Sequence, residues 1–261
     1  MRTVAATRYV TPLREGGSLP AIVEADDSGM YVLKFRGAGQ GTPVLVAELI
    51  CGELARALEL PVPELVLMTL DAALARTEPD PEIRELLKKS VGLNLALDYL
   101  PRSITFDPVV GPAPPAELAS RIVWFDALVT NVDRTPKNPN LLTWHQKLYL
   151  IDHGAALYFH FSSDPPAEAA KSPFAPVKGH VLLPFASALG EADRFCRSKL
   201  SPQLVARVLA EVPDEWLESP GSSHQAQSAA QRARYQEFFE RRLAATNIFL
   251  EEAERARARL L

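Results

Sequence analysis

Two aspartates and an asparagine in the middle of the chain have the spacing of a phosphoryl-transfer site. Asp133 is followed five residues later by Asn138, and Asp152 comes nineteen residues after Asp133 within Ile-Asp-His-Gly. In kinases, D-x-x-x-x-N followed by a strand that ends in D-x-G provides a carboxylate for the attacking hydroxyl and oxygen ligands for magnesium. We therefore predict that Asp133 accepts or orients the acceptor hydroxyl and that Asn138 and Asp152 bind Mg²⁺. Taken alone, Asp133 and Asn138 are also ordinary turn residues, because Asp, Asn and Pro dominate turns.

A lysine in a predicted strand supplies a second, independent signal. Lys34 stands in Tyr-Val-Leu-Lys-Phe, the third strand of an N-terminal sheet. By itself it indicates a surface charge, but in a kinase such a lysine holds the α- and β-phosphates and pairs with a glutamate of the following helix. At 100° per residue, Glu48 lies near the edge of the apolar face of that helix, whereas Glu53 lies roughly opposite. We expect Glu48 to turn inward and pair with Lys34.

A glycine pair and a second lysine would extend the phosphate site. Gly16, Gly17 and Ser18 lie between the first two predicted strands, and glycine lets backbone N–H groups approach phosphate oxygens closely. We expect this loop to lie over the nucleotide, although a plain hairpin turn explains the same residues. Lys137 adjoins Asn138 and would neutralise charge on the transferred phosphoryl group, unless it is a solvated loop lysine.

The elements that must position these residues follow in a mixed order of strands and helices. Short β-prone runs bounded by turn residues predict a sheet, and apolar residues at helical spacing predict the helix that carries Glu48. A later strand leads to Asp98, Tyr99 and Leu100, where order along the chain locates an adenine-binding hinge. The predicted strands are 5–12, 20–25, 30–37, 60–71, 91–101 and the start of 147–159, and the predicted helices are 44–58, 79–90, 116–132, 185–190, 201–211 and 225–261.

This order predicts one α+β domain over residues 1–261 that consists of two lobes. Residues 1–100 would form an N-terminal lobe with an antiparallel sheet and one helix. Residues 101–261 would form a mainly helical lobe that includes a long C-terminal helix. Five prolines between residues 101 and 116 mark the connection between the two lobes.

Composition excludes several classes of protein. Of the 261 residues, 47% are hydrophobic and 23% charged, which is typical of a globular chain rather than a disordered one. The formal net charge of −4 and the absence of a basic patch argue against nucleic acid as a partner. Two cysteines form neither a disulfide framework nor a zinc site. No apolar run approaches the roughly 18 residues that span a bilayer, and the N-terminus lacks a secretory signal, so we expect a cytoplasmic protein without a membrane partner.

The combined motifs resemble those of the HipA-like kinases, relatives of the serine/threonine kinase toxin HipA. The resemblance rests on Asn131-Val-Asp133-Arg-Thr-Pro-Lys137-Asn138, on Ile-Asp152-His-Gly downstream and on Tyr-Val-Leu-Lys34 upstream. It implies a protein-kinase-like, phosphoinositide-kinase-like fold that uses ATP with Mg²⁺ or Mn²⁺. It also implies Asp133 as catalytic base, Asn138 and Asp152 as metal ligands and Lys34 on the phosphates.

Two features of the resemblance bear on regulation and on the acceptor. The chain has no H-R-D or D-F-G motif, and His153 follows Asp152 where D-F-G has phenylalanine. Ser18 is the counterpart of an autophosphorylated serine in the phosphate loop of the toxin. The leading hypothesis is a serine/threonine protein kinase. The alternatives are a small-molecule kinase acting on an antibiotic or metabolite and a nucleotide-binding pseudokinase or regulatory module.

Overall fold

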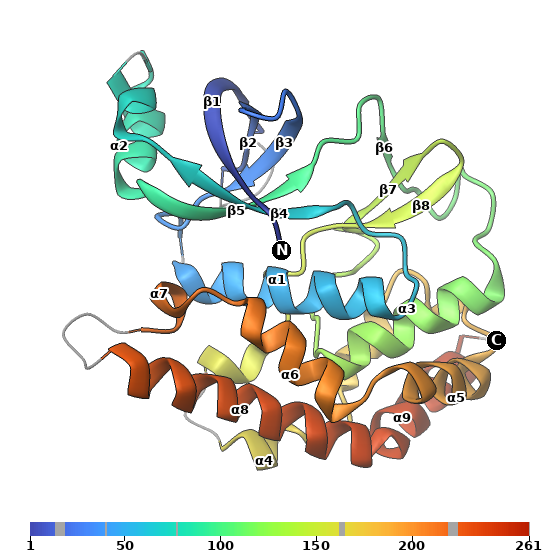
Figure 1. The fold of residues 1–261 in the computed structure, drawn as a ribbon. Coiled ribbons are helices and arrows are strands. Elements are labelled where there is room, and N and C mark those ends of the chain that lie inside the picture. The colour runs from blue at the N-terminus through green and yellow to red at the C-terminus, as the bar shows by residue number, and fades with distance from the viewer. Residues whose placement is uncertain (14–18, 40, 77, 162–164, 219–223, 261) are drawn as a thin grey trace.

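The computed structural model describes residues 1–13, 19–39, 41–76, 78–161, 165–218 and 224–260. Figure 1 shows the first hundred residues as a strand-rich body above a larger group of helices. A long helix near the middle of the view separates the two. The expected α+β composition is therefore present.

Five strands at the N-terminal end close into a barrel in the order β1-β2-β3-β5-β4. Neighbouring strands are antiparallel except β1 and β4, which run parallel with Thr3 opposite Leu67. The expectation of an antiparallel sheet is wrong at this contact. The reason is geometric, because an odd number of strands cannot alternate direction all the way around a closed barrel. The strands are β1 (Thr3–Pro12), β2 (Ala21–Ala25), β3 (Met30–Lys34), β4 (Leu65–Leu70) and β5 (Gly92–Asp98).

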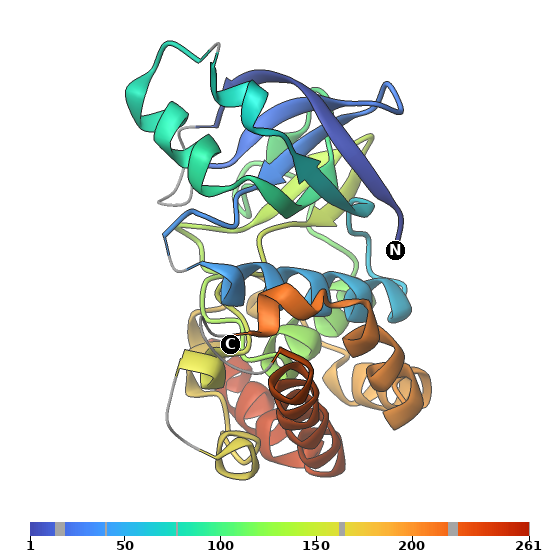
Figure 2. The same ribbon diagram turned by 60° about the vertical axis from the view of Figure 1, so that its left-hand side comes forward.

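Helix α1 (Thr42–Ala57) lies beneath the barrel and is buried on nearly every side. It begins with Pro43 in its first turn, where a missing N–H costs nothing. Figures 1 and 2 show the helix between the barrel above and the remaining helices below. Apolar residues all around α1 therefore contact both parts of the molecule, which is why its apolar face is wider than one stripe.

The helix predicted over 79–90 is confirmed as α2 (Pro81–Lys89), so the N-terminal lobe, expected to hold one helix, contains two. Asp80 caps it by accepting hydrogen bonds from the backbone N–H groups of Glu82 and Ile83. Ile83 and Leu87 are buried and pack with the apolar interior of the barrel. The charged residues of 79–90 face solvent.

Residues 99–115 connect β5 to α3 (Ala116–Leu128). This connection contains β6 (Ile104–Thr105), which the sequence did not predict. It pairs with β7 (Leu141–Trp144), and β7 pairs with β8 (Lys147–Leu150), giving a three-stranded sheet. The loop that follows α3 and the segment that follows β8 carry the predicted catalytic residues.

The remaining chain is helical and folds back on α3. The predicted helix over 185–190 is displaced, because α5 begins at Leu189 and 183–185 is a 3-10 turn. The prediction of a single C-terminal helix is also wrong, since the chain turns at Ala245. After the turn, Phe249 of α9 packs edge-on against Trp124 of α3, with ring centroids 5.5 Å apart. These helices are α4 (Pro166–Ala169), α5 (Leu189–Lys199), α6 (Pro202–Glu211), α7 (Asp214–Leu217), α8 (His224–Ala244) and α9 (Thr246–Ala258). None of the described helices is both long and apolar enough to cross a membrane.

Helix α7 connects the C-terminal helices to the barrel. The indole N–H of Trp216 donates to the carbonyl of Leu93 on β5 at 3.2 Å. The hydroxyl of Thr42, at the start of α1, donates to the Trp216 carbonyl at 3.1 Å. Beside them, Arg36 and Glu215 form an ion pair of 2.5 Å. Three contacts thus hold α7 against both the barrel and the first turn of α1.

Arg242 of α8 is fully buried, and its hydrogen bonds in the described structure go to backbone carbonyls, while its guanidinium lies 4.8 Å from the centroid of the Phe249 ring. Its guanidinium donates to Ala127 and Leu128 at the C-terminal end of α3, and to Ala170 and Ser172 beyond α4. A cation is favourable at a helix C-terminus, where the carbonyls carry partial negative charge. Arg242 therefore joins α8 to the end of α3, just before the loop that carries Asp133.

We expect Arg242→Met to destabilise the protein by about 3 kcal/mol or more, because the carbonyls that it leaves buried lose charge-assisted hydrogen bonds. Arg241→Met is the matched control, since Arg241 is exposed and pairs only with Glu237 one turn earlier. It should cost about 0.5 kcal/mol or less. Denaturant unfolding of the two variants gives the comparison, and equal losses would contradict the role assigned to Arg242.

Candidate active site

Three charged side chains from three elements meet between the barrel and the helices. Lys34 ends β3 and is only 8% exposed. Its Nζ lies 2.5 Å from Oδ1 of Asp152 and 3.6 Å from Oε2 of Glu48. Glu48 is fully buried on α1, whereas Glu53 on the same helix pairs with Arg56. The structure thus brings Lys34 to Glu48 and not to Glu53.

Lys34 and Asp152 stabilise each other in the charged form. Burial works to lower the pKa of Lys34, but Glu48 and Asp152 outweigh it and the pKa is raised. Burial works to raise the pKa of Asp152, but Lys34 outweighs it and the pKa is lowered. For Glu48, burial prevails over Lys34 and the pKa is raised. Lys34 is therefore a cation and Asp152 an anion over the whole physiological range.

The backbone around Asp152 has an unusual conformation and packs closely against α1. Asp152 has a φ of 55°, in the left-handed region that few residues other than glycine adopt. Gly154 lies so close to α1 that a Cβ there would come within 2.6 Å of Val44. Only glycine permits this approach, which explains the D-x-G pattern in physical terms.

His153, between these two residues, is 1% exposed and points into the core. Its ring lies edge-on to Phe125 with centroids 5.9 Å apart, and its Nδ1 is 4.0 Å from Oε1 of Glu48. Burial, assisted by the charge of Arg134, lowers the pKa of His153 to about 3, so the ring is neutral. An imidazole thus occupies a buried position next to the helix that carries Glu48.

The Asp133 loop is ordered by side-chain amides. Asn138 donates from Nδ2 to Oδ2 of Asp133 at 2.8 Å, and Asn140 donates to the same oxygen at 3.4 Å. The backbone N–H of Asp133 donates to Oδ1 of Asn131 at 3.2 Å. Because Asn138 uses its nitrogen on Asp133, its amide oxygen is the atom that could bind a cation. Lys137 is exposed in the same loop.

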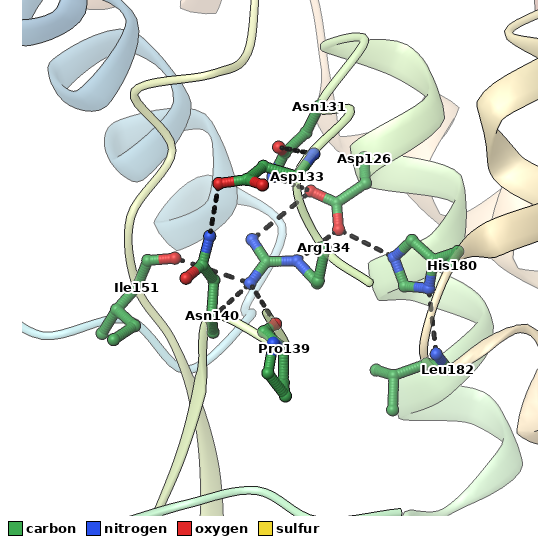
Figure 3. Close-up of polar contacts among 9 residues, drawn as sticks. All are labelled: Asp126, Asn131, Asp133, Arg134, Pro139, Asn140, Ile151, His180 and Leu182. Atoms are coloured by element: carbon green, nitrogen blue, oxygen red, sulfur yellow. Dashed lines mark hydrogen bonds and ion pairs between the residues drawn. The ribbon is translucent and has the colours of Figure 1, made fainter. Parts of the chain in front are cut away.

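A buried ion pair supports this loop from below (Figure 3). Asp126 of α3 and Arg134 are fully buried, and Arg134 Nε lies 2.5 Å from Oδ2 of Asp126. Arg134 also donates to the backbone carbonyl of Asn140. Asn131 donates from Nδ2 to Oδ1 of Asp126 at 3.0 Å. Asp126 therefore orients Asn131, two residues before Asp133, and Arg134, the residue directly after it.

Backbone hydrogen bonds join the Asp133 loop to the Asp152 segment. The N–H of Ile151 donates to the carbonyl of Asn140 at 3.0 Å, and the N–H of Leu157 donates to Val129 at 2.7 Å. The segment that carries Asp152 is thus fixed to both ends of the loop that carries Asp133. The two segments are thus neighbours in the fold, although nineteen positions separate Asp133 from Asp152, and of these two residues Asp152 lines the cleft described next.

A cleft of about 300 Å³ opens beside Lys34 and Asp152. Its other walls come from Phe35, the glycine turn before α1, the first turn of α1, and Gly154 with Ala155. Asp98, Tyr99 and Leu100 do not line it. Strand pairing sets Lys34 opposite Leu95 and Tyr31 opposite Asp98, so the predicted hinge lies about 10 Å further along the sheet. The predicted phosphate loop, Gly16, Gly17 and Ser18, lies outside the described residues.

The donor atoms fit a hard cation. Among the described residues, no three His, Cys, Asp or Glu side chains gather into a metal cluster. Mg²⁺ needs no such cluster, because it retains waters and binds through one or two carboxylates together with substrate phosphates. The carboxylate of Asp152 and the amide oxygen of Asn138 are donors of this kind.

Sequence reasoning missed the residues that support the site. Asp126 could have been noticed as the acid within an apolar helical run, Ile-Val-Trp-Phe-Asp-Ala-Leu-Val. Arg134 stands inside the quoted motif but was given no role. His180, which lies 2.9 Å from Oδ2 of Asp126, had no local signal because its partner is 54 residues away.

The fold is that of kinases. The proinflammatory kinase CtkA of Helicobacter pylori superposes with a TM-score of 0.56 at 11% sequence identity, with 97% of each chain covered. The Golgi casein kinase with Mn/ADP bound has a TM-score of 0.52 at 12% identity, covering 96% of this chain and 74% of its own. At such identities the likeness concerns the fold alone. No curated protein matches the sequence.

The sequence itself identifies the family. The sequence model of the HipA-like kinases matches residues 7–244, so the chain belongs to the HipA-like kinase family. The resemblance inferred from the motifs around Lys34, Asp133 and Asp152 is therefore confirmed, and the chain is an enzyme of the kinase class.

We expect Asp126→Asn to destabilise the protein by about 3–5 kcal/mol, because it leaves the buried guanidinium of Arg134 without its counter-ion. Glu85→Gln is a suitable control, since Glu85 is exposed and pairs only with Lys88 on α2. Its effect on stability should be too small to resolve, because solvent screens an exposed ion pair. Chemical denaturation measures both variants, and an Asp126→Asn protein as stable as the control would refute this role.

Stability should also fall as the pH drops below about 6.5. Burial lowers the pKa of His153 to about 3 and that of His160 to about 4, and burial also lowers the pKa of His180. The unfolded chain binds protons below about pH 6.5 that the folded chain does not, so each such histidine removes up to about 1.4 kcal/mol per pH unit. Full stability is thus present above that pH, and the raised pKa of Glu48 opposes only part of the loss.

Denaturant melts between about pH 7 and pH 5 test this expectation. His160→Gln should reduce the slope of the free energy of unfolding against pH by up to one proton. A wild-type slope of zero would show that the buried histidines titrate as they do in the unfolded chain.

Proposed function

We propose that the protein is an ATP- and Mg²⁺-dependent phosphotransferase that phosphorylates serine or threonine hydroxyls of a protein. The observation that carries the proposal is the meeting of Lys34 with Glu48 and Asp152 beside the Asp133 loop. A lysine between two carboxylates next to an aspartate–asparagine loop provides charge for phosphates, ligands for a cation and a base for a hydroxyl. A fold neighbour with Mn/ADP bound supports the use of a nucleotide and a metal.

Each residue has a separate task in this proposal. Lys34 binds the α- and β-phosphates and Glu48 orients Lys34. Asp152 and the amide oxygen of Asn138 hold Mg²⁺, which when bound neutralises charge on the phosphates of ATP. Asp133 accepts the proton of the attacking hydroxyl.

The remaining assignments concern the edges of the nucleotide. Lys137 is exposed beside Asn138, from where it would reach the transferred phosphoryl group. Gly16, Gly17 and Ser18 would cover the phosphates, with Ser18 as an autophosphorylation site. Asp98, Tyr99 and Leu100 would contact the adenine. Residues 1–100 and 101–261 act in this proposal as the two lobes of one catalytic domain.

Asp133→Asn should abolish transfer while leaving ATP binding unchanged, because the amide cannot accept the hydroxyl proton. We expect kcat to fall by about 10²–10⁴-fold. Asp107→Asn is the matched control, since Asp107 is exposed and its carboxylate accepts the Val109 N–H in a turn. Mass spectrometry after incubation with Mg-ATP and cell lysate reports autophosphorylation, including that of Ser18, and phosphorylated proteins. Phosphorylation of small hydroxyl compounds alone would overturn the protein-kinase part of the proposal.

Asp152→Asn should remove the dependence of nucleotide affinity on the metal, because it deletes a carboxylate ligand. Calorimetric titration of ATP with and without Mg²⁺ or Mn²⁺ measures this dependence. Wild-type affinity should rise when metal is added, and the affinity of the variant should not. Wild-type binding that ignores the metal would contradict the role of Asp152.

A further inference from the structure

His180 lies in the stretch between α4 and α5 and is not among the residues that line the cleft, yet it contacts the acid that supports the Asp133 loop. The residue is 5% exposed, and its Nε2 lies 2.9 Å from Oδ2 of Asp126. Figure 3 shows His180 on the opposite side of Asp126 from Asp133. We propose that His180 is a positioning residue that makes the placement of Asp133 depend on residues 165–188. The catalytic part of this inference rests on the proposed function.

The hydrogen bonds of His180 fix its tautomer. The backbone N–H of Leu182 donates to Nδ1 at 3.0 Å, so Nδ1 is an acceptor without a proton. The proton of the neutral ring is therefore on Nε2, which donates to Asp126. Both nitrogens are used, one to hold the local turn of the segment and the other to hold Asp126.

The effect on Asp133 passes through two further hydrogen bonds. Oδ1 of Asp126 accepts from Nδ2 of Asn131, and Oδ1 of Asn131 accepts from the backbone N–H of Asp133. A parallel link joins the main chains, since the N–H of Val181 donates to the carbonyl of Arg134 at 3.1 Å. Val181 thus binds Arg134, the residue after Asp133, directly, whereas His180 reaches Asn131, two residues before Asp133, through Asp126.

This arrangement links residues 165–188 to the Asp133 loop, on the side of the site where the acceptor would bind. Residues 165–188 follow the Asp152 segment and border the Asp133 loop, where an acceptor must approach. The nucleotide groups Lys34 and Glu48 lie on β3 and α1 and make no contact with His180 among the interactions described. An acceptor that shifts residues 165–188 would therefore act on Asp133 through Asp126 and Arg134, and would reach Asp152 only through the long contact of Arg134 with the Ile151 carbonyl at 3.5 Å. We expect kcat to respond more strongly than the affinity for ATP.

Two substitutions separate the two hydrogen bonds of His180. The amide nitrogen of glutamine can replace Nε2 as the donor to Asp126, and the amide oxygen of asparagine can replace Nδ1 as the acceptor for Leu182. We expect His180→Asn to lower kcat by about 10–100-fold, since a displacement of about 1 Å can cost that much. His180→Gln should keep kcat within about threefold, and neither variant should change the affinity for ATP. His145→Gln, in the exposed β7–β8 turn, controls for the loss of a histidine.

A double-mutant cycle tests the path. In an Asn131→Ala background the link through Asn131 is broken and only the path through Arg134 remains, so His180→Asn should lower kcat by a clearly smaller factor than in the wild type. Multiplicative effects of the two substitutions, equal losses for His180→Gln and His180→Asn, or a loss of ATP affinity would each overturn the proposal. Each of these outcomes would assign His180 a role in local folding alone.

Amide hydrogen exchange of the wild-type protein tests the coupling without any need for activity or for a folded variant. The Asp133 and Leu182 amides should exchange with similar protection, because one opening exposes both. An Asp133 amide that exchanges more than about tenfold faster than Leu182 would overturn the coupling. If no phosphoryl transfer is found with any acceptor, the proposed function fails while this measurement still decides the structural link.

Discussion

The structure depends on a buried ion pair, Asp126 with Arg134, whose two side chains are fully removed from solvent. Removing two charges from water is expensive, and the cost is recovered only when the remaining donors and acceptors are also satisfied. Here Asn131 and His180 complete the coordination of the carboxylate, and backbone carbonyls complete that of the guanidinium. The consequence is that α3, the Asp133 loop, the Asp152 segment and residues 165–188 must meet at one place for any of them to be stable there.

A second constraint fixes the other half of the site. The closed barrel positions Lys34 at the end of β3, and α1 lies directly beneath it with Glu48 inside. Because α1 is apolar on nearly all sides, it cannot leave this position without exposing core residues on both faces. Helix α1 therefore packs against both the barrel and the other helices, and the cluster of Lys34, Glu48 and Asp152 forms beside it.

Local patterns predicted the elements well and the contacts between distant elements poorly. The rotation of 100° per residue was enough to prefer Glu48 over Glu53, since that choice depends on one helix alone. The parallel pairing of β1 with β4, the turn at Ala245 and the bond between His180 and Asp126 each depend on a partner far along the chain. Arg242 resembled the other arginines of a mixed-charge tail, and only the fold distinguishes the one that is buried from those that face solvent.

The contacts of α7 join the barrel to the C-terminal helices at a second place besides residues 99–115. The barrel is joined to the helices by the chain at residues 99–115 on one side, and by Trp216, Glu215 and their partners on the other (Figure 1). Further contacts join the same two parts, among them the ion pair of the N-terminal amine with Glu211 and that of Lys34 with Asp152. Helix α7 thus ties the C-terminal helices both to β5 of the barrel and to the first turn of α1, although it follows these two elements far along the sequence.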